Sequence, residues 1–210
     1  MCREVMDIKE RPILFSGPMV RAILEGRKTQ TRRVIKPNPD NLFQSRTKSH
    51  GFGHGHDGVG WYFSDYEYAE EGTTKWNCPY GQPGDRLWVR ETWTGADDPA
   101  HKHAVLYRAD GERAARWRSS IHMFRWASRI TLEITNVRVE RVRDISELDS
   151  VAEGMDLTPE FEKSKKGHPL APYKTCFAWR WNLHNEKRGF GWLYNPWVWV
   201  IEFKRVENAS

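Results

Sequence analysis

Trp197-Val-Trp-Val-Ile-Glu-Phe203 is the stretch of sequence that decides the fold. Pro196 precedes it, and all of its residues except Glu202 are apolar, so neither side of an extended chain would be polar. A strand that is apolar on both faces has to be covered on both faces. We therefore predict a central or doubly covered strand at 197–203.

Two other segments have strand patterns. After the turn residues Pro83-Gly84-Asp85, apolar and polar or aromatic positions alternate from Arg86 to Trp93. The segment 128–142 also alternates, but its phase shifts near Asn136, which predicts a bulge or turn there.

Short helices are predicted between these segments. Ser16 and Pro18 form a start signal and Gly26 a stop signal, which predicts a short helix that ends just before Arg27 and Lys28.

Ser146 and Asp149 have the spacing of a capping box, and Gly154 can end the helix that they begin, with Glu153 in its last turn. A third short helix is predicted at 177–183.

Short strands, long loops and two or three brief helices favour a mainly β fold with short helices (α+β), arranged as a small β-barrel, over a parallel α/β sheet. The 210 residues are expected to form one domain, 1–210. Residues 37–84 combine turn signals with an acidic aromatic patch, and we interpret them as a long insertion.

Positive charge is concentrated near the N-terminus. The net charge is +5, and residues 1–50 hold eleven Lys and Arg against five Asp and Glu. Such a cluster suits a polyanionic partner, since Lys and Arg neutralise phosphates, although a solvated basic face is the alternative.

No run approaches the roughly 20 apolar residues of a membrane span, and no signal peptide is recognisable, so we expect a cytoplasmic protein with no membrane partner. The three cysteines, Cys2, Cys78 and Cys176, are widely spaced and are expected to be reduced thiols.

His-x-His pairs invite a metal interpretation at His54 and His56 or at His101 and His103, with Cys78 as a further ligand. No ligand set is complete, and glycines on both sides of His54 and His56 indicate a flexible loop. We predict neither a metal site nor a cofactor.

The most distinctive cluster combines cations with hydroxyls: Arg27, Lys28, Thr29, Thr31, Arg32 and Arg33. These side chains can hold phosphate, ribose or a polarised carbonyl. A solvated edge strand is the other interpretation.

Tryptophan is abundant, with eleven residues. Trp beside Arg can form a stacking platform for a nucleobase, for which Trp88 with Arg90, or Trp93, are the candidates. The alternative is that Trp88, Trp197 and Trp199 pack the interior, and for the last strand we favour it.

The segment Leu24-Glu-Gly-Arg-Lys-Thr-Gln-Thr-Arg-Arg33 resembles the opening motif of ASCH-domain proteins, a family of small PUA-like barrels. The segments 83–91, 152–154 and 198–203 agree with that family in order. The sequence of residues 11–37 and 126–155 is most similar to ASCH-like proteins of bacteriophages and prophages. This resemblance implies that the protein has a phage or prophage origin and acts in the cytoplasm of a bacterial host.

The wider family includes amidohydrolases that remove the acetyl group from N4-acetylcytidine. The resemblance implies that Thr31 is the nucleophile, Lys28 its base and Glu153 the group that exchanges protons with the leaving nitrogen. Lys28 would need a lowered pKa for this role. The chain departs from the small amidohydrolases in being about twice as long and in carrying the 37–84 insertion.

Three function classes stay open. The chain is expected to act on RNA or a modified nucleoside, with amide hydrolysis as the most concrete version. It is alternatively an RNA-binding module without turnover, or a ribonuclease. It is also a candidate phage-encoded interaction factor that grips a host protein through an apolar patch in 52–80. The sequence leaves the oligomeric state open.

Overall fold

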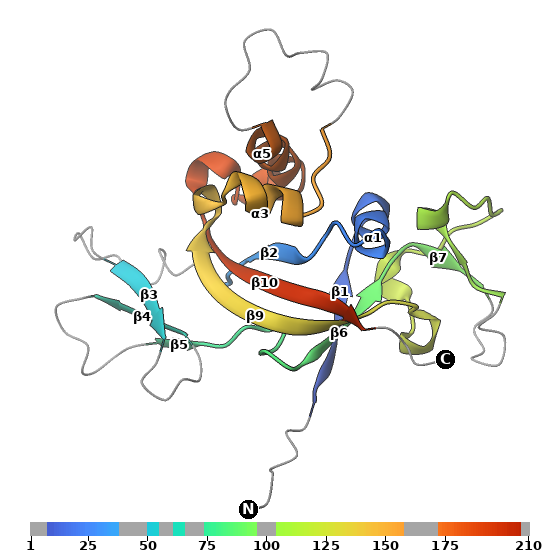
Figure 1. Cartoon of the computed structure of the whole chain (residues 1–210), viewed down its shortest axis with the longest axis horizontal. Coiled ribbons are helices and arrows are strands. Elements are labelled where there is room, and N and C mark those ends of the chain that lie inside the picture. The colour runs from blue at the N-terminus through green and yellow to red at the C-terminus, as the bar shows by residue number, and fades with distance from the viewer. Residues whose placement is uncertain are drawn as a thin grey trace, which may run out of the picture.

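The computed structural model describes residues 8–37, 50–54, 61–65, 74–95, 104–157 and 172–206, and its fold is mainly β with short helices, as the sequence predicts (Figure 1). A mixed five-stranded sheet has the order β1-β6-β9-β10-β2. Its strands are β1 (Glu10–Leu14), β6 (Arg86–Arg90), β9 (Thr131–Arg141), β10 (Trp197–Val206) and β2 (Gln30–Val34).

Strand β10 is central, which confirms the prediction from its apolar sequence. It pairs antiparallel with β9 on one side and with β2 on the other. Its residues Val198, Val200 and Ile201 are fully buried. Both faces of the strand are covered, as an apolar stretch of this length requires.

The predicted irregularity near Asn136 is a β-bulge. Glu202 pairs with Asn136, but the next residue, Phe203, pairs with Ile134, so Thr135 is the extra residue on β9. A bulge bends its strand and increases its twist. Strands β9 and β10 curve strongly across the molecule in Figure 1.

The barrel prediction needs correction, because the described strands form an open sheet with β1 and β2 at its edges. Side chains take the place of the missing backbone pairing. Arg33 on β2 donates from Nη2 to the Leu14 carbonyl at the end of β1, at 2.7 Å. The Arg33 guanidinium also lies over the ring of buried Phe15, 5.2 Å from its centroid.

Two smaller sheets lie outside the main one. Strands β3 (His50–His54), β4 (Trp61–Asp65) and β5 (Thr74–Trp76) form an antiparallel sheet within the predicted insertion. His54 therefore ends a strand instead of lying in the expected flexible loop. Strands β7 (Trp93–Thr94) and β8 (Leu106–Tyr107) form the other sheet.

Several predictions about the insertion and its histidines fall outside the described residues. His56, His101 and His103 are among these positions, as are residues 55–60 and 66–73 of the 52–80 segment proposed as an apolar patch. The metal and host-protein interpretations of these segments stay predictions.

The helices follow the capping signals in part. Helix α1 (Gly17–Leu24) has Ser16 at its N-cap position, but the Ser16 side chain makes no capping hydrogen bond. Helix α3 (Glu147–Ala152) begins with the predicted capping box. Helix α5 (Pro172–Asn185) extends beyond the predicted 177–183. The 3₁₀ turns are η2 (Arg108–Asp110), η3 (Ser120–His122), η4 (Arg125–Ala127), η5 (Val142–Asp144), η6 (Glu186–Arg188) and η7 (Trp192–Tyr194).

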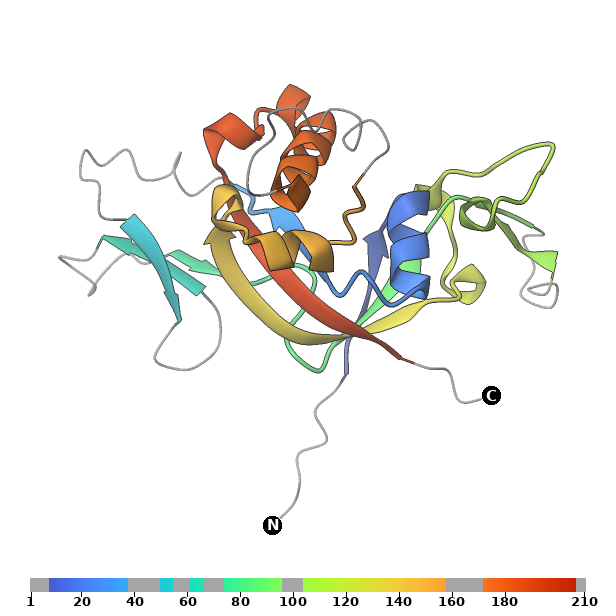
Figure 2. The same cartoon turned by 45° about the horizontal axis from the view of Figure 1, so that its top comes forward.

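The described residues form three hydrophobic clusters in the interior. The largest packs α1 against the sheet, and the second packs β10 against α5. Figure 2 shows α3 and α5 together over one part of the curved sheet and α1 over another. A third, small cluster surrounds the fully buried Trp93.

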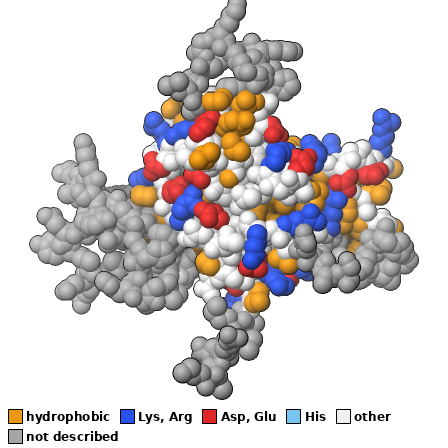
Figure 3. Space-filling view, viewed as in Figure 1, with side chains coloured by type: hydrophobic (Ala, Val, Ile, Leu, Met, Phe, Trp, Pro, Cys, Tyr) orange, Lys and Arg blue, Asp and Glu red, His pale blue; other side chains and the backbone are white. Residues whose placement is uncertain are grey.

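The outer surface is mixed in character. Figure 3 shows hydrophobic side chains gathered over α3 and α5, where Leu148 and Trp179 are exposed, and positive and negative side chains interspersed below them. Among the described residues, no helix has the length and apolar character that crossing a membrane requires.

Candidate functional site

Lys28 is the most unusual polar residue of the fold, since its ammonium group is buried and bound to three oxygens. Nζ donates to the Gln30 carbonyl at 2.7 Å, to the Glu153 carbonyl at 2.9 Å and to Glu153 Oε2 at 2.9 Å. The Lys28 side chain has no exposed surface and Glu153 is 3% exposed. An ammonium group has three protons to donate, and here each one has an acceptor.

Local structure brings Lys28 and Glu153 together across 125 residues of sequence. Lys28 follows the end of α1, and Glu153 is the C-cap residue of α3. The two residues form an isolated antiparallel β-bridge, beside which the Thr29 amide donates to the Ala152 carbonyl at 2.9 Å. The capping box at Ser146 fixes the start of α3 and therefore the place of Glu153.

Gly154 permits this close approach. Its φ is +76°, and a Cβ at this position would lie 2.8 Å from the Cβ of Ala22 and 3.0 Å from the Cβ of Lys28. Only glycine adopts this backbone conformation without strain and leaves room for the neighbouring chain.

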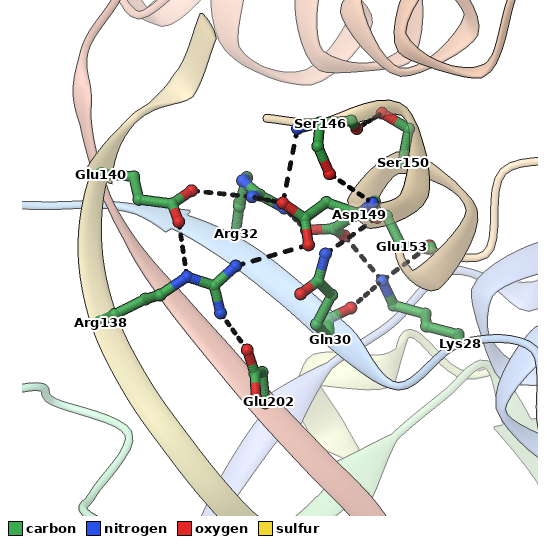
Figure 4. Close-up of polar contacts among 10 residues, drawn as sticks. All are labelled: Lys28, Gln30, Arg32, Arg138, Glu140, Ser146, Asp149, Ser150, Glu153 and Glu202. Carbon is green, nitrogen blue, oxygen red and sulfur yellow. Dashed lines mark hydrogen bonds and ion pairs between the residues drawn. The ribbon is translucent and has the colours of Figure 1, made fainter. Parts of the chain in front are cut away.

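Arg32 connects the buried pair to a wider ionic network (Figure 4). Its guanidinium contacts Glu153 at 3.3 Å, Asp149 at 3.2 Å and Glu140 at 2.8 Å. Arg138 on β9 extends the network to Glu140, Asp149 and Glu202. Figure 4 shows Lys28 just before β2, Arg32 on β2 and Arg138 on β9, facing the carboxylates of Asp149 on α3 and of Glu153 at its C-cap.

The environment lowers the pKa of Lys28. Burial disfavours the charged ammonium and lowers this pKa, while the neighbouring Glu153 carboxylate opposes the shift. For Asp149, burial raises the pKa, but Gln30 and the charge of Arg32 lower it, and the net result lies below the ordinary value. A buried lysine with a lowered pKa is the kind of group that can give up a proton.

A cleft of about 860 Å³ lies beside this network, between the two edges of the open sheet. Residues of β1, β2 and α5 line it, together with Glu153 and Thr31. Thr31 is 2% exposed and lies next to Arg32 on β2. The aromatic residues that line the cleft are Phe15, Trp76, Tyr80, Phe177, Trp181 and Trp199.

The charge of the cleft lining is strongly positive. Among the described residues that line the cleft, five are cationic and one, Glu153, is acidic. The cations are Arg32, Arg33, Lys36, Arg180 and Arg188. Arg32 and Glu153 are already paired with each other. The remaining cations give the cleft an excess of positive charge that favours an anionic ligand.

The structure brings some of the sequence-predicted residues to this cleft. Thr31, Glu153, Arg32 and Arg33 line it, and Lys28 lies behind Glu153. Among described residues, however, no hydrogen bond links Lys28 Nζ to Thr31, because all three Nζ protons go to oxygens of Gln30 and Glu153.

Arg27 and Thr29 do not line the cleft. Arg27 is exposed and its guanidinium binds Glu25 and Asp156. Thr29 is also exposed, and its backbone joins Ala152 to Phe203 by hydrogen bonds.

The residues predicted to form a stacking platform, Trp88 with Arg90 or Trp93, lie outside the cleft. Trp93 has no exposed surface and Trp88 is 8% exposed, so neither offers a free face to a base. Arg90 lies over the Trp88 ring, 4.6 Å from its centroid, and donates to the Ile121 carbonyl. None of the three borders the cleft. The alternative of tryptophan as packing material fits Trp88 and Trp199, which is 2% exposed, whereas Trp197 is half-buried. Trp93 is packed in the interior as well.

One wall of the cleft, formed by α5 and η6, was not among the sites predicted from the sequence. Arg180, His184 and Arg188 line it at intervals of four residues. This spacing, which places side chains on one face of a helix, was the available signal. The predicted helix ended at residue 183, so the pattern was cut short.

Within the described ranges, no group of three or more His, Cys, Asp or Glu residues is arranged to hold a metal ion. Cys78 is a poor nucleophile, because burial raises the pKa of its thiol to about 11.

Comparison with known proteins adds little to this geometry. No protein-family model matches the chain, and no curated protein sequence matches it. A solved structure to which it is similar is protein EF3133 from Enterococcus faecalis V583, of the family DUF984, with a TM-score of 0.42 and 9% sequence identity. The match covers 98% of this chain and 87% of that one. A likeness this distant carries no inference about function.

Proposed function

We propose that the chain is an ASCH-type domain that acts on RNA or a modified nucleoside, and that its cleft hydrolyses an exocyclic amide such as that of N4-acetylcytidine. The observation that carries the proposal is the buried Lys28–Glu153 pair, joined at 2.9 Å and adjoining a basic cleft that Thr31 also lines. The motif around Lys28 and Thr31 that resembles the ASCH family supports the same assignment.

The buried pair supplies both proton carriers of the reaction. Transfer of one proton along the hydrogen bond from Lys28 Nζ to Glu153 Oε2 turns the ion pair into a neutral amine and a neutral acid. Burial favours this neutral form, because two charges lose hydration in the interior. The contact between Arg32 and Glu153 at 3.3 Å opposes it, because a neighbouring cation stabilises the ionised carboxylate.

The reaction then proceeds through an acetyl ester on Thr31. Lys28 accepts the proton of the Thr31 hydroxyl as Oγ1 bonds to the acetyl carbon, and the amide C–N bond breaks while Glu153 donates its proton to the leaving nitrogen. The products of this half are cytidine and an acetyl ester on Thr31. Water then hydrolyses the ester to acetate and restores the Thr31 hydroxyl.

Thr31→Val is the sharpest test, because it removes the hydroxyl and keeps the shape of a residue that is 2% exposed. We expect purified protein to release acetate from N4-acetylcytidine, the valine variant to lose this activity, and Thr31→Ser to restore part of it, as followed by chromatography. Thr131→Val, at a buried threonine that does not line the cleft, is the matched control. A valine variant as active as the control would contradict the role of Thr31.

A second candidate is binding of RNA without turnover. It is favoured by the complete set of oxygen partners around Lys28 Nζ, none of which is Thr31. This candidate predicts no product from any acylated nucleoside, together with RNA affinity that falls steeply with salt. Intact RNA after prolonged incubation would exclude the ribonuclease alternative.

A further inference from the structure

The proposed steps of amide hydrolysis give no role to the unpaired cations of the cleft. Within the described part of the chain, Lys36, Arg180 and Arg188 have no carboxylate partner. A free nucleoside carries no negative charge for them to bind. Their grouping in one cleft therefore indicates that the ligand brings anionic groups of its own.

Arg33 adds a buried donor to the same cleft. Its Nη2 is used by the Leu14 carbonyl, but its Nε is buried and lacks a hydrogen-bond partner among the described residues. A buried guanidinium nitrogen without an acceptor is costly unless a ligand supplies one. Phosphate oxygens are well matched to such a donor.

The cations lie on two walls. Arg33 and Lys36 lie in and after β2, whereas Arg180 and Arg188 come from α5 and η6. Arg180 lies in α5 and Arg188 in the 3₁₀ turn that follows it, so the two guanidinium groups come from different turns of this wall. Two separate cations on one wall suit a ligand with more than one phosphate group.

We propose that the cleft binds a single-stranded nucleic acid, with Arg180 and Arg188 holding successive phosphates, and that the reactive base is presented within this strand and not as a free nucleoside. This inference rests on the proposed function for the identity of the base, but not for the phosphate contacts. A volume of about 860 Å³ is within the range of small-ligand sites and suits one or two nucleotides, not a duplex. The aromatic lining, including Tyr80 and Phe15, offers apolar surface for the bases.

Fluorescence anisotropy with a labelled, unmodified single-stranded RNA tests the phosphate contacts independently of catalysis. We expect the double variant Arg180→Gln/Arg188→Gln to bind at least about tenfold more weakly than the unsubstituted protein. Each phosphate contact on a single strand contributes about 0.7 to the slope of log affinity against log salt, so this slope should fall by about 1.4. Arg205→Gln, an exposed arginine outside the cleft, is the matched control for lost charge.

Competitors identify the form of the ligand. Unlabelled RNA and DNA strands of the same sequence should displace the probe, and their ratio shows which sugar is preferred, whereas a duplex, CTP and free cytidine should compete far more weakly. CTP that competes as well as a strand would overturn the proposal in favour of a small nucleotide. Equal affinity of the double variant and the Arg205 control would also overturn it.

The two proposals fail separately. Strand binding that depends on Arg180 and Arg188, with no release of acetate from any substrate, would support the phosphate contacts and contradict the hydrolysis. Release of acetate from free N4-acetylcytidine that depends on Thr31, without strand binding, would support the hydrolysis and contradict the phosphate contacts.

Discussion

At the scale of single residues, the buried charge of Lys28 is compensated by one carboxylate, that of Glu153. A buried ion pair contributes little compared with a well-packed apolar pair, but removal of one partner leaves the other as an uncompensated charge. Within the described part of the chain, the Glu153 carboxylate retains only the Arg32 contact at 3.3 Å when Lys28 is lost, and Arg32 is shared with Asp149 and Glu140.

We therefore expect Lys28→Met to lower the free energy of unfolding by about 3–5 kcal/mol, as measured by urea denaturation. Addition of Glu153→Gln should recover part of this loss, because the double variant no longer buries an unpaired carboxylate. A double variant as unstable as the single one would mean that packing around Lys28, and not charge, determines the stability. The activity of Lys28 variants needs this control before it is interpreted.

Sequence reasoning at the residue scale was limited by tertiary contacts. The family resemblance pointed to Lys28 and Glu153, which the fold joins at 2.9 Å, but no local spacing connects positions 125 residues apart. Trp93 shows the converse. It looked suited to stacking on a base, yet the small cluster of Val105, Met123 and Ala127 encloses it completely.

At the scale of elements, local signals predicted what local interactions determine. The capping box of α3, the bulge opposite Glu202 and the central position of β10 all follow from spacings of a few residues. The open edge between β1 and β2 could not be predicted, because it depends on Arg33 and Phe15 occupying the space where a barrel would close. The arginine wall of α5 was missed because the helix extends beyond its periodic segment.

Helix α3 has only six residues, so its capping interaction contributes a large share of its stability. Ser146 accepts a hydrogen bond from the Asp149 amide at 3.0 Å, and Asp149 in turn accepts one from the Ser146 amide. Ser146→Ala should lower the free energy of unfolding by about 1 kcal/mol. It should also reduce turnover, because α3 positions Glu153.

Ser16→Ala is the matched control for this prediction, since Ser16 has the same position at α1 but makes no capping hydrogen bond. Urea denaturation of both variants gives the comparison. Equal losses at the two serines would indicate that the cap geometry of α3 contributes nothing beyond the intrinsic preference of serine.

At the scale of the whole molecule, one partly buried ionic group connects the small cluster around Trp93 to the sheet. Arg129 binds Glu91 at 2.9 Å and Asp110 at 2.7 Å, and its guanidinium stacks on the Tyr107 ring at 3.9 Å. Glu91, which follows β6, is 1% exposed. Burial raises the pKa of Glu91 and Arg129 opposes the shift, so that the net pKa lies above the ordinary value.

Arg129→Met should make stability strongly dependent on pH. Without the guanidinium, the folded pKa of Glu91 rises further above the value of about 4.3 in the unfolded chain. Over that interval the folded state keeps a proton that the unfolded state has lost, so stability falls as pH rises from about 4.3 to the folded pKa. The variant should thus lose more stability, relative to the unsubstituted protein, at about pH 7 than at about pH 4.

Urea denaturation at both pH values tests this, with Arg129→Met/Glu91→Gln as the control whose loss should not depend on pH. A single variant with the same loss at both values would show that Glu91 reaches water once Arg129 is gone, and that the cluster around Trp93 opens instead of burying the carboxylate.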